Sequence, residues 1–302
     1  MGRDILASAS ERSSSTRPVL RGRWHTSRRW NSYSTFICRD RERHGWKTLV
    51  MQAAFRIATF LVVFLYGILW VGGITSSVLW GEAPASASWA APAFLYISSL
   101  LLLKTSGVRS GLLLLAVGVY GFGIEILGLT TGVLFGDYKY TAVLGPGMFG
   151  VPYALVSSWM VVTAFAVFVL VYLRIPRKWW VVVGPFVMVI LDLILEPAAT
   201  GPMGAWIWES AGGYYGVPIN NFVGWFIASI PIFTFLSLSR YSHRDSLHIA
   251  ASVLLFFIAL SVAHLLWTPV FIALLFVGLW VFWKRFRETN LGCESALLDG
   301  AK

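Results

Sequence analysis

Three carboxylic acids lie within long apolar segments of the sequence: Glu125, Asp192 and Glu196. An ionised acid inside a bilayer is costly, and such residues usually face the interior of a helix bundle and have a function. Asp192 and Glu196 are four residues apart and therefore share one helix face. Because burial away from water favours the neutral form of an acid, these are candidate catalytic residues that can hold a proton and donate it to a substrate.

Aromatic and amide side chains lie close to these acids in the sequence. Aromatic faces can stabilise a nearby cation, although Tyr and Trp rings also form the belts found at membrane interfaces. Interfacial solvation is likewise an alternative for Asp192 and for Glu125 and Glu196, the last two of which lie near segment ends. Amide groups can hold a water molecule or orient a carboxyl group. The expected substrate-binding residues are Tyr138, Tyr140, Trp206, Trp208, Tyr214, Tyr215, Asn220 and Asn221.

Several kinds of cofactor chemistry lack their signatures in this sequence. There is no HxxxH or HxxHH cluster for a di-iron site, and His248 and His264 are too far apart along one helix to share a metal. No GxGxxG motif follows a strand, so no dinucleotide-binding fold is indicated. No expected membrane span contains a Lys for a Schiff base. We therefore expect no metal and no cofactor.

The elements that must position these residues are long apolar helices. Only 13% of the 302 residues are charged and 57% are hydrophobic, whereas a soluble domain carries about 25% charged residues. Lipid must therefore cover much of the chain, and apolar segments in lipid must be helices. The sequence predicts an all-α, polytopic transmembrane bundle of about eight spans. These spans are 57–78, 87–103, 112–129, 151–173, 179–195, 217–238, 247–266 and 269–283.

The net charge of +10 is a topology signal more than a sign of nucleic-acid binding. Residues 1–48 contain 11 of the 24 Lys and Arg residues, and most others lie in short loops on one side of the spans. The loops on the opposite side contain a single basic residue, Lys139. Because basic loops stay in the cytoplasm, both termini are expected there and the acids near the other face.

This pattern predicts three regions along the chain. Residues 1–48 are expected to be a basic, disordered cytoplasmic tail, although a targeting peptide or a true start at Met51 are alternatives. Residues 49–287 are the transmembrane helical domain. Residues 288–302 are a second cytoplasmic tail.

Two central regions resemble each other and predict a parallel internal repeat of helices three–four and five–six. Each region has an acid, then a Gly- and aromatic-rich loop, then Gly-Val-Pro, six residues and a Trp. The matching prolines, Pro152 and Pro218, are 66 residues apart. Pro is also common in a first helical turn, so chance is the alternative. Membrane proteins often place sites at such repeat interfaces.

Short motifs in the same regions carry a family resemblance. They are Glu125, Gly128, Gly132, Phe135-Gly136-x-Tyr138-x-Tyr140, Leu144-Gly145-Pro146, Gly150-Val151-Pro152, Trp159, Asp192-x3-Glu196-Pro197, Trp206-x-Trp208, Gly213-Tyr214-Tyr215-Gly216-Val217-Pro218 and Asn221-x2-Gly224-Trp225. With these motifs, residues 57–285 resemble the carotenoid biosynthesis membrane family that includes carotenoid 1′,2′-hydratases and bisanhydrobacterioruberin hydratases. That family often has Asp-Pro where this chain has Glu196-Pro197.

The resemblance implies a hydratase, a carbon–oxygen lyase that adds water to a terminal isoprenoid C=C of an acyclic carotenoid. The implied substrate is of the lycopene or γ-carotene type, and membrane lipid and other carotenoid-pathway enzymes are the further expected partners. Asp192 or Glu125 would be the general acid, and the other, or Glu196, would position the water. Tyr138, Trp208 and Tyr215 would flank the cation.

Two other functions remain open from the residues alone. A carotenoid cyclase also protonates an alkene with a carboxylic acid, but an internal double bond captures the cation. A proton-coupled small-molecule transporter would use intramembrane acids and a parallel repeat equally well. Product mass distinguishes a cyclase from a hydratase, because cyclisation leaves the mass unchanged. Uptake without chemical conversion would identify a transporter.

Overall fold

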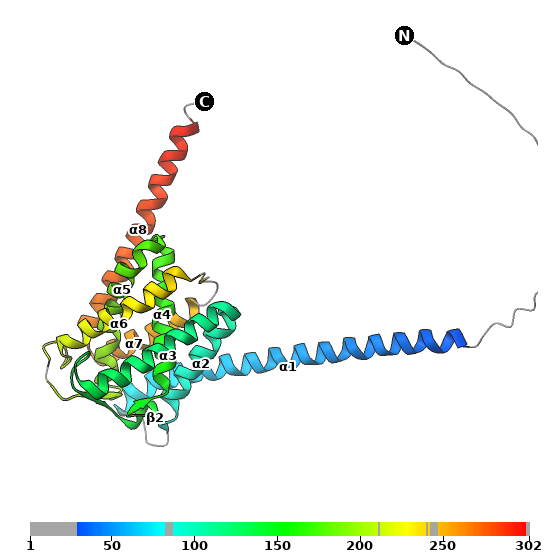
Figure 1. The fold of residues 1–302 in the computed structure, drawn as a ribbon, viewed down its shortest axis with the longest axis horizontal. Coiled ribbons are helices and arrows are strands. Elements are labelled where there is room, and N and C mark those ends of the chain that lie inside the picture. The colour runs from blue at the N-terminus through cyan, green and yellow to red at the C-terminus, as the bar shows by residue number, and fades with distance from the viewer. Residues whose placement is uncertain (1–28, 82–86, 211, 240, 242–246, 300–302) are drawn as a thin grey trace, which may run out of the picture. The chain divides into compact units, whose positions relative to one another are not determined.

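A bundle of helices makes up most of the chain in the computed structural model, which describes residues 29–81, 87–210, 212–239, 241 and 247–299 (Figure 1). Each of the eight apolar segments corresponds to one helix over most of its length, so the predicted all-α fold is confirmed. The helices are α1 (Arg29–Trp80), α2 (Ala90–Ser106), α3 (Val108–Thr131), α4 (Ala154–Tyr172), α5 (Trp180–Thr200), α6 (Ile219–Leu238), α7 (Leu247–Ala263) and α8 (Trp267–Asp299).

Five of the described helices are long and apolar enough to cross a membrane, and they belong to α1, α3, α4, α5 and α6. The apolar parts of α2, α7 and α8 are shorter, so the count of eight spans stays a prediction, as does the orientation of the termini. Large side chains such as Phe60 and Phe64 of α1 are more than half exposed, as lipid-facing residues should be. α4 is mostly buried because it packs against α2, α3, α5 and α7.

The first and last helices extend beyond the expected limits of the membrane domain. α1 begins at Arg29 rather than near residue 49, and α8 continues to Asp299 rather than ending near 287. Residues 1–28 and 300–302 of the expected tails lie outside the described residues. The chain divides into two compact units, 1–58 and 59–302, and the candidate site lies wholly within the second. The three-region division stays a prediction.

The loops after α3 and α5 contain short strands that the sequence did not predict. β1 (Tyr138–Tyr140) pairs antiparallel with β4 (Trp206–Trp208), with Lys139 opposite Ile207. β2 (Gly147–Met148) pairs with β3 (Val151–Pro152) in a hairpin. Two 3₁₀ turns, η2 (Ala142–Leu144) and η3 (Arg177–Trp179), complete the connections. The β1–β4 pair thus joins two loops that are distant in sequence.

The two loops also share a turn at matching positions. Phe149 and Gly150 have φ values of +53° and +82°, and Tyr215 and Gly216, 66 residues later, have +51° and +83°. Two consecutive positive φ values are typical of a type I′ turn, for which Gly is well suited. Residues flanking each turn make the same antiparallel bridge. These matches support the predicted repeat, which for whole helices stays a prediction.

Candidate functional site

A small cavity lies between two of the three acids. Glu125 of α3 and Glu196 of α5 are only 5% and 2% exposed, and both reach this cavity. It leaves about 20 Å³ for the centre of a water molecule, which is room for one water. The residues that line it are Glu125, Phe135, Tyr138, Tyr140, Glu196, Trp206, Trp208, Asn221 and Trp225.

Glu125 accepts three hydrogen bonds from ring donors. The hydroxyls of Tyr138 and Tyr140 donate to its Oε2 over 2.7 and 2.8 Å, and Trp159 Nε1 donates to Oε1 over 3.2 Å. Tyr138 and Tyr140 lie on one face of β1 because side chains alternate along a strand. Three donors around one carboxyl group stabilise its ionised form.

Both tyrosines keep their protons in this setting. Burial raises the pKa of Tyr138 and of Tyr140, and the neighbouring charge of Glu125 raises both further. Each ring therefore remains an O–H donor at neutral pH.

Glu196 is held in the same way by the paired strand. The indole Nε1 atoms of Trp206 and Trp208 both donate to its Oε1 over 2.8 Å. The same alternation along β4 brings the two rings to one face. Unlike a tyrosine hydroxyl, an indole N–H can only donate. Each strand of the pair thus holds one glutamate with alternate aromatic residues.

Asp192 is 2% exposed but is not among the described residues that line the cavity. Asn221 Nδ2 donates to its Oδ2 over 2.7 Å. Asp192 and Glu196 lie one helical turn apart on the same face of α5, and both are buried. Because Glu125 and Glu196 line the same cavity, the three acids lie in one polar cluster.

Three other residues expected at the site do not line the cavity. Asn220 is exposed, because adjacent residues on a helix point in different directions and only Asn221 turns inward. The Tyr215 hydroxyl donates to Thr268 Oγ1 over 3.1 Å and ties the loop to α8. Tyr214 is half-buried and its hydroxyl bonds to α5. None of these three lines the cavity in the described part of the chain.

Tyr214 compensates for a proline within α5. Pro197 has no N–H, so the Leu193 carbonyl four residues earlier lacks its helical partner. The Tyr214 hydroxyl donates to that carbonyl over 2.7 Å. This bond fastens the loop to the turn of α5 between Asp192 and Glu196.

Replacing Tyr214 with Phe is expected to destabilise the fold by about 1–3 kcal/mol, because it leaves the Leu193 carbonyl unsatisfied. Adding Pro197→Ala should restore much of the loss, since an alanine at that position supplies the missing N–H. Thermal melting in detergent measures both effects. Tyr215→Phe, next in the chain but bonded at the surface to Thr268, is the control and should melt nearly like wild type. An unchanged melting temperature for Tyr214→Phe would contradict this role.

Sequence reasoning missed Trp159, Trp225 and Phe135 as site residues. Trp159 and Trp225 are the matching tryptophans of the predicted repeat, and their rings stack at 4.4 Å between centroids and 14° between planes. Trp159 bonds to Glu125, and Trp225 lines the cavity. Their place in the repeated motif was the available signal, because equivalent residues can meet at a repeat interface.

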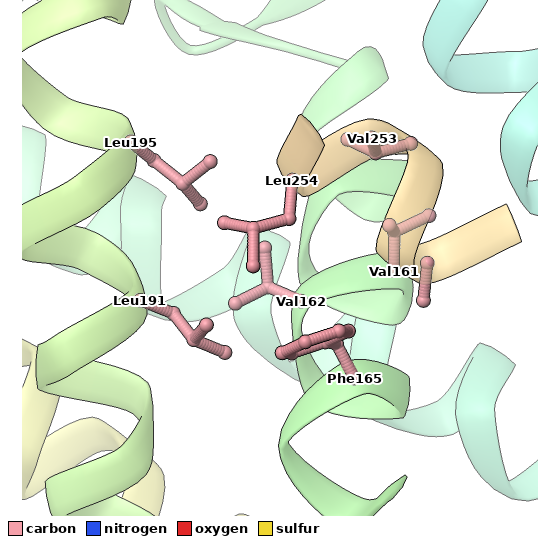
Figure 2. A pocket seen from close by; sticks show the side chains of 8 residues that line it. Val161, Val162, Phe165, Leu191, Leu195, Val253 and Leu254 are labelled. Carbon is pink, nitrogen blue, oxygen red and sulfur yellow. The ribbon is translucent and has the colours of Figure 1, made fainter. Parts of the chain in front are cut away.

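A second small cavity is a packing void. Figure 2 shows Leu191 and Leu195 of α5 facing Val162 and Phe165 of α4 and Leu254 of α7. It offers about 10 Å³ and has an apolar lining, whereas a buried water needs polar partners. We therefore assign it no ligand.

The histidines and acids of the described chain form no metal site. Among the described residues, no group of three or more His, Cys, Asp or Glu side chains could hold a metal ion. His264 Nε2 is instead hydrogen-bonded to Ser77 Oγ at 2.7 Å, which links the turn after α7 to α1.

Comparison with known proteins places this architecture in a family. Over 125 residues the chain is 33% identical to bisanhydrobacterioruberin hydratase from Haloarcula japonica; the match covers 40% of this chain and 42% of that relative. The chain thus matches less than half the length of that curated relative. No solved structure matches it. The family model described as "Carotenoid biosynthesis protein" matches residues 89–280 and so spans the whole candidate site. The chain is therefore an integral membrane member of the carotenoid biosynthesis protein family.

Proposed function

We propose that this protein is a carotenoid hydratase, a carbon–oxygen lyase that adds water across a terminal isoprenoid C=C of an acyclic end group. The observation that carries the proposal is the water-sized cavity between Glu125 and Glu196, lined by aromatic rings. The named relative is itself a hydratase, and its match supports the same reaction class.

The proposed reaction needs only groups that line or adjoin the cavity. A protonated carboxyl group transfers its proton to one alkene carbon, and the π electrons form the new C–H bond. The other carbon becomes a tertiary cation. The oxygen of the held water then adds to the cation, and the resulting oxonium returns one proton to a carboxylate. The sum is alkene plus water giving a tertiary alcohol, with no proton gained or lost.

A carboxylate and several aromatic rings at the cavity would stabilise the cation. The Glu125 carboxylate, held by three donors, is a fixed negative charge on one side of the cavity. Trp208, Tyr138 and Trp225 present aromatic rings to the same space. Such preorganised groups need no rearrangement as the charge develops.

The cavity has room for the water but not for an end group, so substrate binding requires its lining to open. A long polyene dissolves in lipid, and entry from the bilayer suits a site between helices. In the proposed topology both termini are cytoplasmic and the site faces the other side. Membrane lipid and other carotenoid-pathway enzymes remain proposed partners.

The proposal is tested by expressing the chain in cells that make lycopene or γ-carotene. We expect a product heavier than the substrate by one water, and ¹⁸O from labelled water in its hydroxyl group. Label from O₂ would instead indicate an oxygenase. An altered product of unchanged mass would indicate a cyclase. Cells carrying a chain with all three acids replaced by amides are the control.

A further inference from the structure

The three carboxyl groups of the cluster differ in the donors they receive. Glu125 accepts three hydrogen bonds, and these occupy both of its carboxyl oxygens. Glu196 accepts two such bonds and Asp192 accepts one. Hydrogen bonds to the charged form favour that form. Of the three acids, Glu125 therefore has the donors that best stabilise an ionised carboxylate.

Glu196 has one oxygen that remains able to carry a proton. Both indole donors go to Oε1, which leaves Oε2 outside those bonds. Asp192 lies one helical turn away on the same helix face, and both acids are buried. Two ionised carboxylates buried as neighbours repel each other, which favours one proton held by the pair.

Only one acid of the Asp192–Glu196 pair reaches the cavity. Glu196 lines the cavity, whereas Asp192 is buried against Asn221 and outside the described lining. We infer that Asp192 and Glu196 form a dyad that holds a single proton, that Glu196 is the catalytic residue that delivers it, and that Asp192 is a positioning residue that keeps Glu196 protonated. This assignment rests on the proposed hydration reaction.

In each turnover Glu196 donates one proton and then regains one. Glu196 gives its proton to the alkene carbon and becomes a carboxylate. After water adds, the oxonium passes one proton back to Glu196 and the C–OH bond remains. No other proton carrier is needed between turnovers. Glu125 keeps its charge throughout.

Other titratable groups surround the dyad. The three donors to Glu125 of α3 favour its ionised form. Tyr138 and Tyr140 of β1 keep their protons. Tyr214, in the loop before α6, keeps its proton too, since burial raises its pKa. Among the described groups around the site, this leaves the proton of the Asp192–Glu196 pair as the one to be transferred.

The first experiment measures hydration rate against pH for purified wild type, Asp192→Asn and Glu196→Gln. In Asp192→Asn the amide donates to Glu196 and leaves it ionised, so activity at neutral pH should fall about 100-fold and recover in acid. Glu196→Gln should be inactive at every pH. A wild-type pH profile in Asp192→Asn, or a folded Asp192→Asn that stays inactive in acid, overturns the assignment. Activity in Glu196→Gln does so as well.

The second experiment needs no turnover. Infrared difference spectra between H₂O and D₂O should show one protonated carboxyl band in wild type, retained in Glu125→Gln and lost in Glu196→Gln. Its loss in Glu125→Gln would overturn the dyad, even if Asp192→Asn does not fold. If wild type makes no hydrated product, the proposed function fails while the infrared result still decides whether the dyad exists.

Discussion

Glu125→Gln is expected to lower the hydration rate by about 100-fold or more, the usual effect of losing a preorganised charged group. In the proposed mechanism, the substitution removes the negative charge that would face the developing cation. Its amide NH₂ would also face O–H and N–H donors, whereas three donors now converge on the carboxylate. Because the change alters charge and not size, membrane insertion should be unaffected. Product formed per unit of folded protein in the carotenoid-producing host measures the effect.

The matched control is Glu209→Gln, on the outer side of the same strand pair. Glu209 is half-exposed and bonds to Lys139 Nζ at 3.0 Å. An exposed ion pair contributes little, so this variant should keep the wild-type rate. Equal rates for Glu125→Gln and wild type would remove Glu125 from the mechanism.

Gly121→Ala is expected to cost about 1–3 kcal/mol of stability, as overpacking of a tight core does. A Cβ at Gly121 would lie 2.2 Å from Cγ of Trp159. Trp159 is 1% exposed and stacked on Trp225, so the ring cannot simply swing aside. Moving it also breaks its bond to Glu125. Melting temperature and hydration rate should therefore fall together.

Gly123→Ala, two residues later on the same helix, is the control. A Cβ there meets nothing within 4 Å. Ala is a better helix former than Gly by roughly 0.5–1 kcal/mol, so this variant should melt at or slightly above the wild-type temperature. If both alanine variants behave alike, the close contact between α3 and Trp159 does not support the site.

The helices and the acids could be read from the sequence because they depend on local rules. In lipid each apolar segment must satisfy its own backbone, and a helix does so without help from distant residues. The four-residue spacing likewise places Asp192 and Glu196 on one face whatever surrounds them. Family membership followed from motifs such as Gly-Val-Pro, and the match over residues 89–280 confirms it.

The composition of the site depended on contacts between distant segments. Nothing local says that Tyr138 pairs with Trp208 across 70 residues, or that each strand holds the glutamate of its own half. Neighbours such as Asn220 and Asn221 are alike in sequence, and only the packing of α6 turns Asn221 inward. Phe135 was overlooked for the same reason, since it meets Gly128 and Gly224 only in the folded chain.

The sequence by itself determined a membrane-embedded helical protein with three acids carried on apolar helices. Only the tertiary structure decided which rings hold each acid, and that Glu196 rather than Asp192 reaches the cavity. The physical reason is the range of the interactions. Helix hydrogen bonds close within four residues, whereas strand pairing and ring stacking here join residues about 66 positions apart.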